Sequence, residues 1–374
     1  MEKSSIIRLI KPNISPAEIE AVNQVLNSGM LVNGPMVRRF ESLLAKFLGV
    51  ANAVCVSSGT AALHLSLLAG NIRPGDEVIV SAFTFPATAN VVEIAGAVPV
   101  FVDNRPGDVN IDPDKIPGKI SVRTKAIIPV HAFGLPAEME TVLSIAAKYN
   151  LTVIEDAACA LGSKYNERAC GSLGDLAAFS FHPRKLLTTG EGGAVVTDDG
   201  ILADMIRSLR NHGYDQGDYG NVGLNYRMTD FQAALGISQL ERYPQMLENR
   251  KRLADKYSDI ISDIKWLKPL STEPHIDWNR QTYIVIVDEE INRDSLIKHL
   301  ADNDVEATIG TYCVPLTKYY RLRYGFTADE FPAAFDMYKR SLSLPLFDDM
   351  SGSQLSHIYF ALKKFKNHKQ EVMA

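Results

Sequence analysis

The chain has 374 residues, which is ample for a sizeable hydrophobic core and suggests two or three domains on length alone. Its residues are 46% apolar and 22% charged, the composition of an ordinary soluble globular protein. A net charge of -5 without any cluster of lysines or arginines leaves no electrostatic footprint for nucleic acid or an anionic membrane, so the composition favours work on small molecules.

No segment of the sequence predicts membrane targeting. The N-terminus is too short and too interrupted by charge to be a signal peptide, and the most apolar later stretch, residues 91–102, is broken by Glu93, Gly96 and Pro99. We therefore expect a cytoplasmic enzyme. Because the cysteines have no metal-ligand spacing, we expect no metal site, and we expect free thiols at Cys55, Cys159, Cys170 and Cys313.

From residue 12 to residue 243, short runs rich in valine and isoleucine alternate with segments of helical period. This alternation is typical of strand–helix units that feed a mostly parallel sheet, so we predict an α/β fold. Helices predicted over residues 61–68, 86–96 and 136–148 would cover the faces of the sheet. Seven strands are predicted, over residues 53–56, 77–80, 98–103, 126–130, 151–156, 177–181 and 194–197.

After Tyr243 the pattern changes. A charged helical stretch over residues 244–263 precedes a strand at 282–287 and helices at 292–303 and 353–366. We therefore predict a large α/β domain over residues 1–243 and a smaller α+β domain over residues 244–374.

The run Ser57-Ser58-Gly59-Thr60 follows a predicted strand and opens a predicted helix. Free backbone N–H groups at such a helix start, together with the positive end of the helix dipole and the hydroxyls, form a site suited to a phosphate. A plain alternative is that Ser58 only caps the helix. Because the chain has neither a Rossmann nor a Walker-type glycine motif, the usual nucleotide fingerprints are missing.

Asp156 ends the strand-like run Leu151-Thr-Val-Ile-Glu-Asp156 and precedes two alanines, so its carboxylate is expected in a semi-buried place. An unpaired carboxylate there is costly, and a cationic pyridinium would offset that cost. Glu155 alternates to the other face. The alternative is that Asp156 caps a helix or joins a buried salt bridge.

Lys185 lies between the apolar run Ala177-Ala-Phe-Ser-Phe181 and the glycine-rich run Gly190-Glu-Gly-Gly193. Lysine is usually a solvated surface charge, but burial in a pocket of this kind lowers its pKa and makes the amine nucleophilic. An amine that can form a Schiff base, with an acid at the end of another strand, is what a pyridoxal 5'-phosphate enzyme requires. Ser180 could add a hydroxyl to the phosphate.

With these residues the chain resembles the DegT/DnrJ/EryC1/StrS family, the sugar aminotransferases of pyridoxal phosphate fold type I. The resemblance covers nearly the whole chain. It is carried by Ser57-Ser-Gly-Thr-Ala-Ala-Leu63, Pro74-Gly-Asp-Glu-Val-Ile-Val80, Thr84-Phe-Pro-Ala-Thr-Ala-Asn90, Ile154-Glu-Asp-Ala-Ala158, Phe179-Ser-Phe-His-Pro183 with Lys185, Gly190-Glu-Gly-Gly193 and Gly223-Leu-Asn-Tyr-Arg-Met-Thr-Asp230.

The resemblance implies a role for individual positions. Lys185 would be the catalytic lysine and Asp156 the partner of the pyridine nitrogen, while Asn225 would reach the cofactor of a neighbouring subunit, so that a homodimer shares its active sites. Phe85 would stack on the cofactor ring, although most such phenylalanines belong to the core. The phosphate would be held by the segment that contains Ser58, Gly59 and Thr60, and by Ser180.

Some positions depart from the family pattern. Cys159 stands where many members have a glutamine near the ring hydroxyl, so a weaker or different cofactor contact is expected. Arg184 stands where threonine or asparagine is common, and Thr317 stands where many members have a histidine near the sugar. Arg210 and Arg227 are both candidates for binding the donor's carboxylate.

By this resemblance the protein would move an amino group, with L-glutamate as donor, onto a keto group of a nucleotide-linked deoxy sugar, for a surface glycan or a secondary metabolite. One alternative is a sugar dehydratase of the same fold, against which Lys185 argues because such dehydratases have a histidine in its place. A second alternative is a non-catalytic regulatory protein, which would need no nucleophile.

Overall fold

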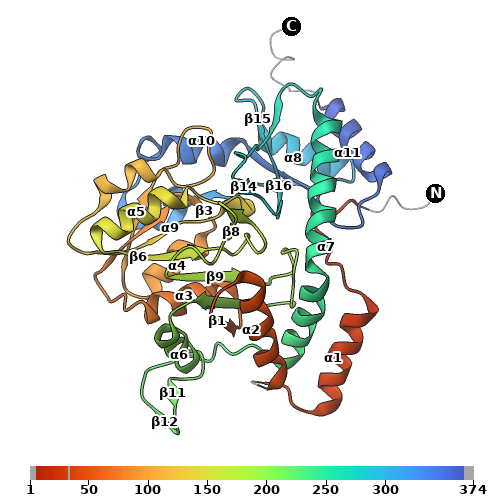
Figure 1. Ribbon diagram of the computed structural model, residues 1–374. Coiled ribbons are helices and arrows are strands. Elements are labelled where there is room, and N and C mark those ends of the chain that lie inside the picture. Colours follow the sequence, from red (N-terminus) through yellow and green to blue (C-terminus); the bar gives the residue numbers. More distant parts are fainter. Residues whose placement is uncertain (1–5, 33, 366–374) are drawn as a thin grey trace.

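The computed structural model describes residues 6–32 and 34–365, and a seven-stranded sheet forms its centre (Figure 1). The strand order is β1-β10-β9-β6-β5-β2-β4, and β10 alone runs in the opposite direction to the other strands of this sheet. The predicted α/β sheet is thus confirmed, with strand ends shifted by at most two residues. The strands are β1 (Asn52–Val56), β2 (Glu77–Ser81), β4 (Val98–Val102), β5 (Thr124–Ile128), β6 (Thr152–Asp156), β9 (Leu176–Ser180) and β10 (Gly193–Thr197).

Both faces of this sheet are buried, which explains why its strands are apolar runs. In β1, Val54 and Val56 belong to one hydrophobic cluster, while Ala53 and Cys55 belong to another on the opposite face. The first face is covered by α3 (Gly59–Ala69), α4 (Pro86–Ile94) and α6 (Gly200–Leu209). The second face is covered by α2 (Pro35–Leu48), α5 (Met139–Tyr149) and the first half of α7 (Asp230–Ile261).

Helix α7 differs from the sequence-based expectation of a helix over residues 244–263. It begins at Asp230, where Thr229 and Gln232 form a capping box, and it continues through Pro244 to Ile261. Its first half packs on the sheet and its second half belongs to a separate cluster around Tyr257. The predicted domain boundary after Tyr243 therefore falls inside one continuous helix, and the division into two domains stays a prediction.

The predicted helix over residues 136–148 starts later than expected. Ala137 donates its N–H to the side chain of His131, so the chain turns there instead of coiling, and α5 begins only at Met139. Asn150 ends the helix in the left-handed conformation, which asparagine tolerates.

A second, antiparallel sheet of four strands follows α7 in the chain, in the order β13-β15-β18-β16. Leucine, valine and tyrosine side chains of this sheet pack against α8, α11 and the end of α7. Residues 282–287 and 292–303 are thus confirmed as strand and helix, and of the predicted helix at 353–366 all but the last residue lies inside the described part. The elements are β13 (Leu267–Pro269), β15 (Tyr283–Val287), β16 (Thr308–Ile309), β18 (Ser341–Leu344), α8 (Arg293–Asp302) and α11 (Gly352–Lys364).

Part of the C-terminal segment packs on the first sheet. Strand β17 (Tyr312–Cys313) pairs with β3 (Phe83–Thr84), and α9 (Lys318–Tyr324) and α10 (Pro332–Arg340) join the cluster that contains α3 and α4. Phe101 of β4, for example, contacts the ring of Tyr320 edge to face at 5.2 Å between centroids. The C-terminal residues thereby close one side of the large core.

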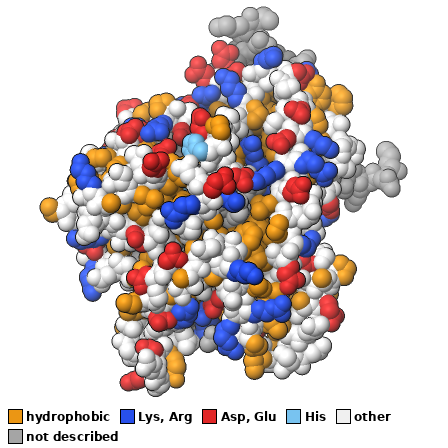
Figure 2. Space-filling model, in the orientation of Figure 1, with side chains coloured by type: hydrophobic (Ala, Val, Ile, Leu, Met, Phe, Trp, Pro, Cys, Tyr) orange, Lys and Arg blue, Asp and Glu red, His pale blue; other side chains and the backbone are white. Residues whose placement is uncertain are grey.

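The remaining elements are short or peripheral, and α1 packs along α7 (Figure 1). On the face shown in Figure 2, acidic and basic side chains are interspersed without a large field of one sign. These remaining elements are α1 (Pro16–Ser28), β7 (Lys164–Tyr165), β8 (Arg168–Ala169), β11 (Tyr214–Asp215), β12 (Asp218–Tyr219) and β14 (Ile276–Asp277), with 3-10 turns at Pro113–Lys115, Pro117–Lys119, Ala132–Gly134, Val314–Leu316 and Ala328–Glu330.

Candidate active site

A cavity of about 760 Å³ lies where the two sheets meet. Its walls come from the carboxyl ends of β6 and β9, from the starts of α3 and α4, and from residues of the antiparallel sheet such as Tyr283 and Ser343. This is the position at which ligands bind in open α/β sheets. The cavity brings together all but one of the predicted site residues: Ser58, Gly59, Thr60, Phe85, Asp156, Cys159, Ser180 and Lys185.

Asp156 ends β6 at the cavity wall, and its side chain is nearly buried, with 6% of its surface exposed. Thr88 of α4 donates its hydroxyl to one carboxylate oxygen at 2.7 Å, and the N–H of Ala158 donates to the other at 3.2 Å. Within the part of the chain that the structure describes, no cation pairs with this carboxylate. A buried negative charge held by neutral donors at a cavity wall suits a cationic ligand group.

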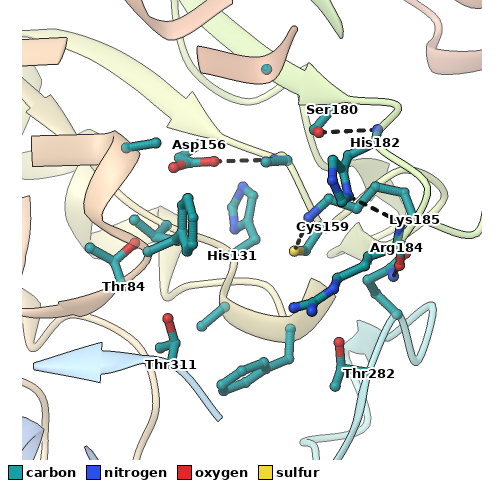
Figure 3. Close-up of a pocket in the computed structure, with 18 of the residues that line it drawn as sticks. Thr84, His131, Asp156, Cys159, Ser180, His182, Arg184, Lys185, Thr282 and Thr311 are labelled. Atoms are coloured by element: carbon teal, nitrogen blue, oxygen red, sulfur yellow. Dashed lines mark hydrogen bonds between the residues drawn. The ribbon is translucent and has the colours of Figure 1, made fainter. Parts of the chain in front are cut away.

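Lys185 reaches the same cavity from the loop after β9, and its amine donates to the sulfur of Cys159 at 2.9 Å (Figure 3). The loop is fixed by Gln281, whose amide donates to the carbonyl of Arg184 and accepts from the N–H of Leu186, at 2.8 and 3.0 Å. Gln281 was not predicted as a site residue, and no local pattern in the sequence distinguishes it.

The start of α3 lies at the cavity, where the sequence predicts an anion site. Ser58 caps the helix by accepting the N–H of Ala61 at 3.1 Å, so the plain capping role is also real. Gly59 lies so close to β9 that a Cβ atom there would come within 2.7 Å of the Cβ of Ser180. The first N–H groups of the helix, which have no acceptor within the helix, therefore lie beside the Ser180 hydroxyl and can bind a phosphate.

Phe85 immediately precedes α4 and is 64% exposed, which is unusual for phenylalanine. Its ring lines the cavity and contacts Tyr312 at 6.5 Å between centroids. One aromatic face is therefore available to a flat ligand.

Asn225 is the predicted site residue that the cavity does not include. It is exposed, and its backbone pairs with Asn211 close to the hairpin of β11 and β12. A contact between Asn225 and the cofactor of a neighbouring subunit stays a prediction.

Neither arginine that the sequence offered for the donor carboxylate lines the cavity. Arg210 is 7% exposed and donates to the side chain of Glu41 and the carbonyl of Cys55. Arg227 donates to the side chain of Asn211 at 2.7 Å. Arginine side chains lining the cavity are instead Arg184 and Arg250.

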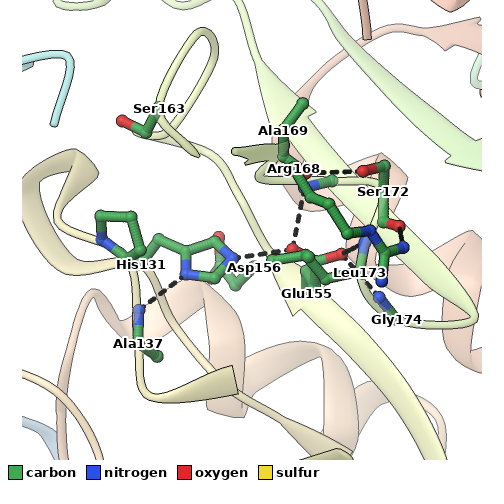
Figure 4. Close-up of polar contacts among 12 residues, drawn as sticks. His131, Ala137, Glu155, Asp156, Ser163, Arg168, Ala169, Ser172, Leu173 and Gly174 are labelled. Carbon is green, nitrogen blue, oxygen red and sulfur yellow. Dashed lines mark hydrogen bonds and ion pairs between the residues drawn. The ribbon is translucent and has the colours of Figure 1, made fainter. Parts of the chain in front are cut away.

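A buried histidine–glutamate pair lies beside Asp156 (Figure 4), and its histidine, His131, also lines the cavity. The N–H of Ala137 donates to Nδ1 of His131 at 3.0 Å, so the proton of the ring is on Nε2, which donates to Glu155 at 2.9 Å. The carboxylate of Glu155 also accepts three backbone N–H groups, of Gly171, Leu173 and Gly174, each at 2.8 Å.

Two opposing effects act on the pKa of Glu155. Burial raises the pKa, but the hydrogen bonds from His131 and the backbone outweigh it and hold the pKa of Glu155 below its ordinary value. The sequence showed only that Glu155 faces away from Asp156. The pair was missed because its two members are 24 residues apart and meet only through the pairing of β5 with β6.

The residues of the cavity fit pyridoxal 5'-phosphate. An anion site, an exposed aromatic face, an unpaired buried carboxylate and a primary amine match the phosphate, the ring, the pyridinium nitrogen and the aldehyde of that cofactor.

In the ranges that the structure describes, no helix combines the length and apolarity needed to cross a bilayer.

Comparisons with known proteins agree with this chemistry. The sequence model of the DegT/DnrJ/EryC1/StrS aminotransferase family matches residues 12–363. The chain is 40% identical to the spore coat polysaccharide biosynthesis protein SpsC of Bacillus subtilis, over 94% of this chain and 95% of that protein. It is 40% identical to GDP-perosamine synthase of Caulobacter vibrioides, over 80% of this chain and 83% of that enzyme.

The fold is also similar to that of solved structures. A putative sugar aminotransferase from Streptococcus pneumoniae, in its PLP form, superposes with a TM-score of 0.93 at 29% identity, over 99% of this chain and 100% of that one. The predictions of an enzyme, of fold type I, of pyridoxal 5'-phosphate as cofactor and of a sugar as amino acceptor are thereby confirmed at the level of the family. The chain belongs to the DegT/DnrJ/EryC1/StrS aminotransferase family.

Proposed function

We propose that the protein transfers the amino group of L-glutamate to a keto group of a nucleotide-linked deoxy sugar. The observation that carries this proposal is the presence, in one cavity, of the Lys185 amine and the unpaired Asp156 carboxylate beside an anion site. The names of the relatives, which refer to a spore coat polysaccharide and to GDP-perosamine, support a product used in a surface glycan. The alternative is that the amino sugar enters a secondary metabolite.

The residues of this chain would hold the cofactor from three sides. Asp156 would accept a hydrogen bond from the protonated pyridine nitrogen, the start of α3 with Ser180 would bind the phosphate, and Phe85 would cover the ring. Pyridoxal 5'-phosphate, when bound, supplies an electron-accepting ring that eases loss of a proton from the carbon bearing the amino group.

Lys185 would carry that proton. Its amine is part-buried and is directed by Cys159, so it is held inside the cavity instead of in bulk water. A positioned amine that accepts a proton in one half of the reaction and returns it in the other acts as a general acid–base catalyst. Because both substrates use the same cavity in turn, we expect ping-pong kinetics.

A homodimer with shared active sites and a cytoplasmic location complete the proposal. The exposed position of Asn225, outside its own cavity, is compatible with a contact to a partner subunit.

The test is a screen of the purified, cofactor-loaded enzyme with glutamate and a panel of nucleotide-linked 3-keto and 4-keto deoxy sugars, with amino sugars detected by mass spectrometry. We expect one or a few members of the panel to be aminated, and no amination with Lys185→Ala. Absence of glutamate-dependent amination across the panel would refute the proposed function.

A further inference from the structure

Arg184 is a cavity residue whose backbone is fixed and whose side chain has no partner. Its N–H donates to Nδ1 of His182 at 3.1 Å, and its carbonyl accepts from Gln281 at 2.8 Å. Figure 3 shows its guanidinium directed into the cavity next to the side chain of Lys185. Among the residues that the structure describes, none forms an ion pair or a hydrogen bond with this guanidinium.

The second arginine of the cavity is in a different state. Arg250 is 3% exposed and donates to the carbonyls of Arg280, Gln281 and Leu346 at 2.8, 2.8 and 3.0 Å. It also lies 3.7 Å from the carboxylate of Asp348. The guanidinium of Arg250 is thus bound within the protein, whereas the N–H groups of the Arg184 guanidinium are available to a ligand.

The groups around Arg184 favour an anion near Lys185. His182 is neutral at ordinary pH, because burial lowers its pKa despite the nearby Glu191. Glu191 also lines the cavity, and its carboxylate lies 3.9 Å from Nε2 of His182. The guanidinium of Arg184 lies next to the Lys185 side chain (Figure 3), and its fork matches a carboxylate in two parallel hydrogen bonds.

We propose that Arg184 binds the α-carboxylate of the amino-acid donor. This inference rests on the proposed function. It follows from the number of bonds between each anionic group of the two substrates and the reacting carbon. The amine of a donor must arrive where the Lys185 amine lies, and the α-carboxylate is attached to the same carbon as that amine. The phosphates of a nucleotide sugar are attached at the anomeric carbon, at least two ring carbons from a keto group at position 3 or 4, so they lie farther from Lys185.

The proposal predicts a selective effect on one half-reaction. In Arg184→Gln we expect kcat/KM for glutamate to fall on the order of 10- to 100-fold, as is typical for loss of a charged hydrogen-bonded pair, while the KM for the nucleotide sugar changes less than about threefold. Arg184→Lys keeps the positive charge but loses the planar guanidinium, so its kcat/KM for glutamate should lie between those of wild type and Arg184→Gln. The matched control is Arg252→Gln, an exposed arginine of α7 outside the cavity, which should behave as wild type.

Substrate analogues show which carboxylate is bound. Glutamic acid α-amide lacks the α-carboxylate and should react poorly with wild type, and Arg184→Gln should cause little further loss with it. Binding of glutarate, which cannot be transaminated, should weaken in the same variant when it is measured by calorimetry.

Three results would overturn the role of Arg184. These are an unchanged glutamate reaction in Arg184→Gln, a loss confined to the nucleotide sugar, and a loss with the α-amide as large as with glutamate. The reaction of the wild-type enzyme with amino acids is a separate test. If the wild-type enzyme reacts with no amino acid at all, the proposed function itself is refuted, whereas a normal wild-type reaction that persists in the variant refutes only the assignment of Arg184.

Discussion

The amine of Lys185 donates to the sulfur of Cys159 at 2.9 Å, so a thiol is in contact with the proposed catalytic amine. Cys159 is part-exposed, whereas the three other cysteines are buried. Burial raises the pKa of Cys55 and of Cys170 well above its ordinary value and raises the pKa of Cys313 to about 12.

These differences predict selective alkylation of Cys159. Iodoacetamide should modify Cys159 first and should stop transamination in step with the modification, because the added group would fill the space next to Lys185. Peptide mass spectrometry with parallel rate measurements checks this, and Cys159→Ser should stay active under the same treatment. Inactivation that follows modification of Cys170 would contradict the prediction.

Lys185→Ala should abolish amino transfer while leaving the fold intact, because Lys185 is part-exposed and its side chain lines the cavity. Turnover with glutamate and a circular dichroism spectrum are the two measurements. Lys119→Ala, an exposed lysine of a 3-10 turn, is the control and should keep full activity. Full activity of Lys185→Ala would refute its assignment as the catalytic lysine.

Asp156→Asn should lower the rate of the glutamate half-reaction by roughly two to three orders of magnitude, since a neutral amide cannot keep the ring nitrogen protonated. The hydroxyl of Thr88 can still donate to the amide oxygen, so the melting temperature should change little. Stopped-flow absorbance gives the rate. A variant as fast as wild type would show that the charge at this position is not used.

Glu155→Gln should destabilise the protein and alter its pH dependence. The folded carboxyl has a pKa below that of the unfolded chain, which is about 4.3. Folding is therefore stabilised above that pH, and this stabilisation is lost as the pH falls through the folded pKa. Loss of the charge at neutral pH should cost about 1.5–3 kcal/mol, because the neutral His131 and three backbone N–H groups would lose a charged acceptor.

Denaturant unfolding of wild type and Glu155→Gln between about pH 3.5 and 7 measures this difference. The gap in free energy of unfolding should narrow at the acid end of the range. Glu167→Gln, an exposed glutamate, should show no such gap. A gap that is constant with pH would mean that ionisation of Glu155 does not contribute.

Asn225→Ala should weaken cofactor retention if this residue reaches across a dimer. Cofactor content after dilution and gel filtration, together with light scattering, gives both the retention and the oligomeric state. Unchanged retention in a variant that is still dimeric would count against the cross-subunit contact.

The strands of the large sheet could be predicted because both of its faces are buried, so each strand is an apolar run. The first half of helix α7 was missed because Pro244 favours a helix start, whereas here it costs one hydrogen bond inside a continuous helix.

The site divides in the same way. Asp156 and Lys185 follow strands in the chain, so local pattern identified them as candidates. His131 and Gln281 act on residues 24 and 95 or more positions away, and such partners become neighbours only through tertiary packing.

The clamp by Gln281 has a mechanical consequence. Its side chain extends from just before β15 and grips the loop on either side of Lys185, at Arg184 and Leu186. A displacement of the antiparallel sheet relative to the seven-stranded one would thus drag the reactive nitrogen with it. Any opening of the active site that admits a bulky sugar nucleotide must therefore either keep the hydrogen bonds of Gln281 intact or move the amine of Lys185 at the same time.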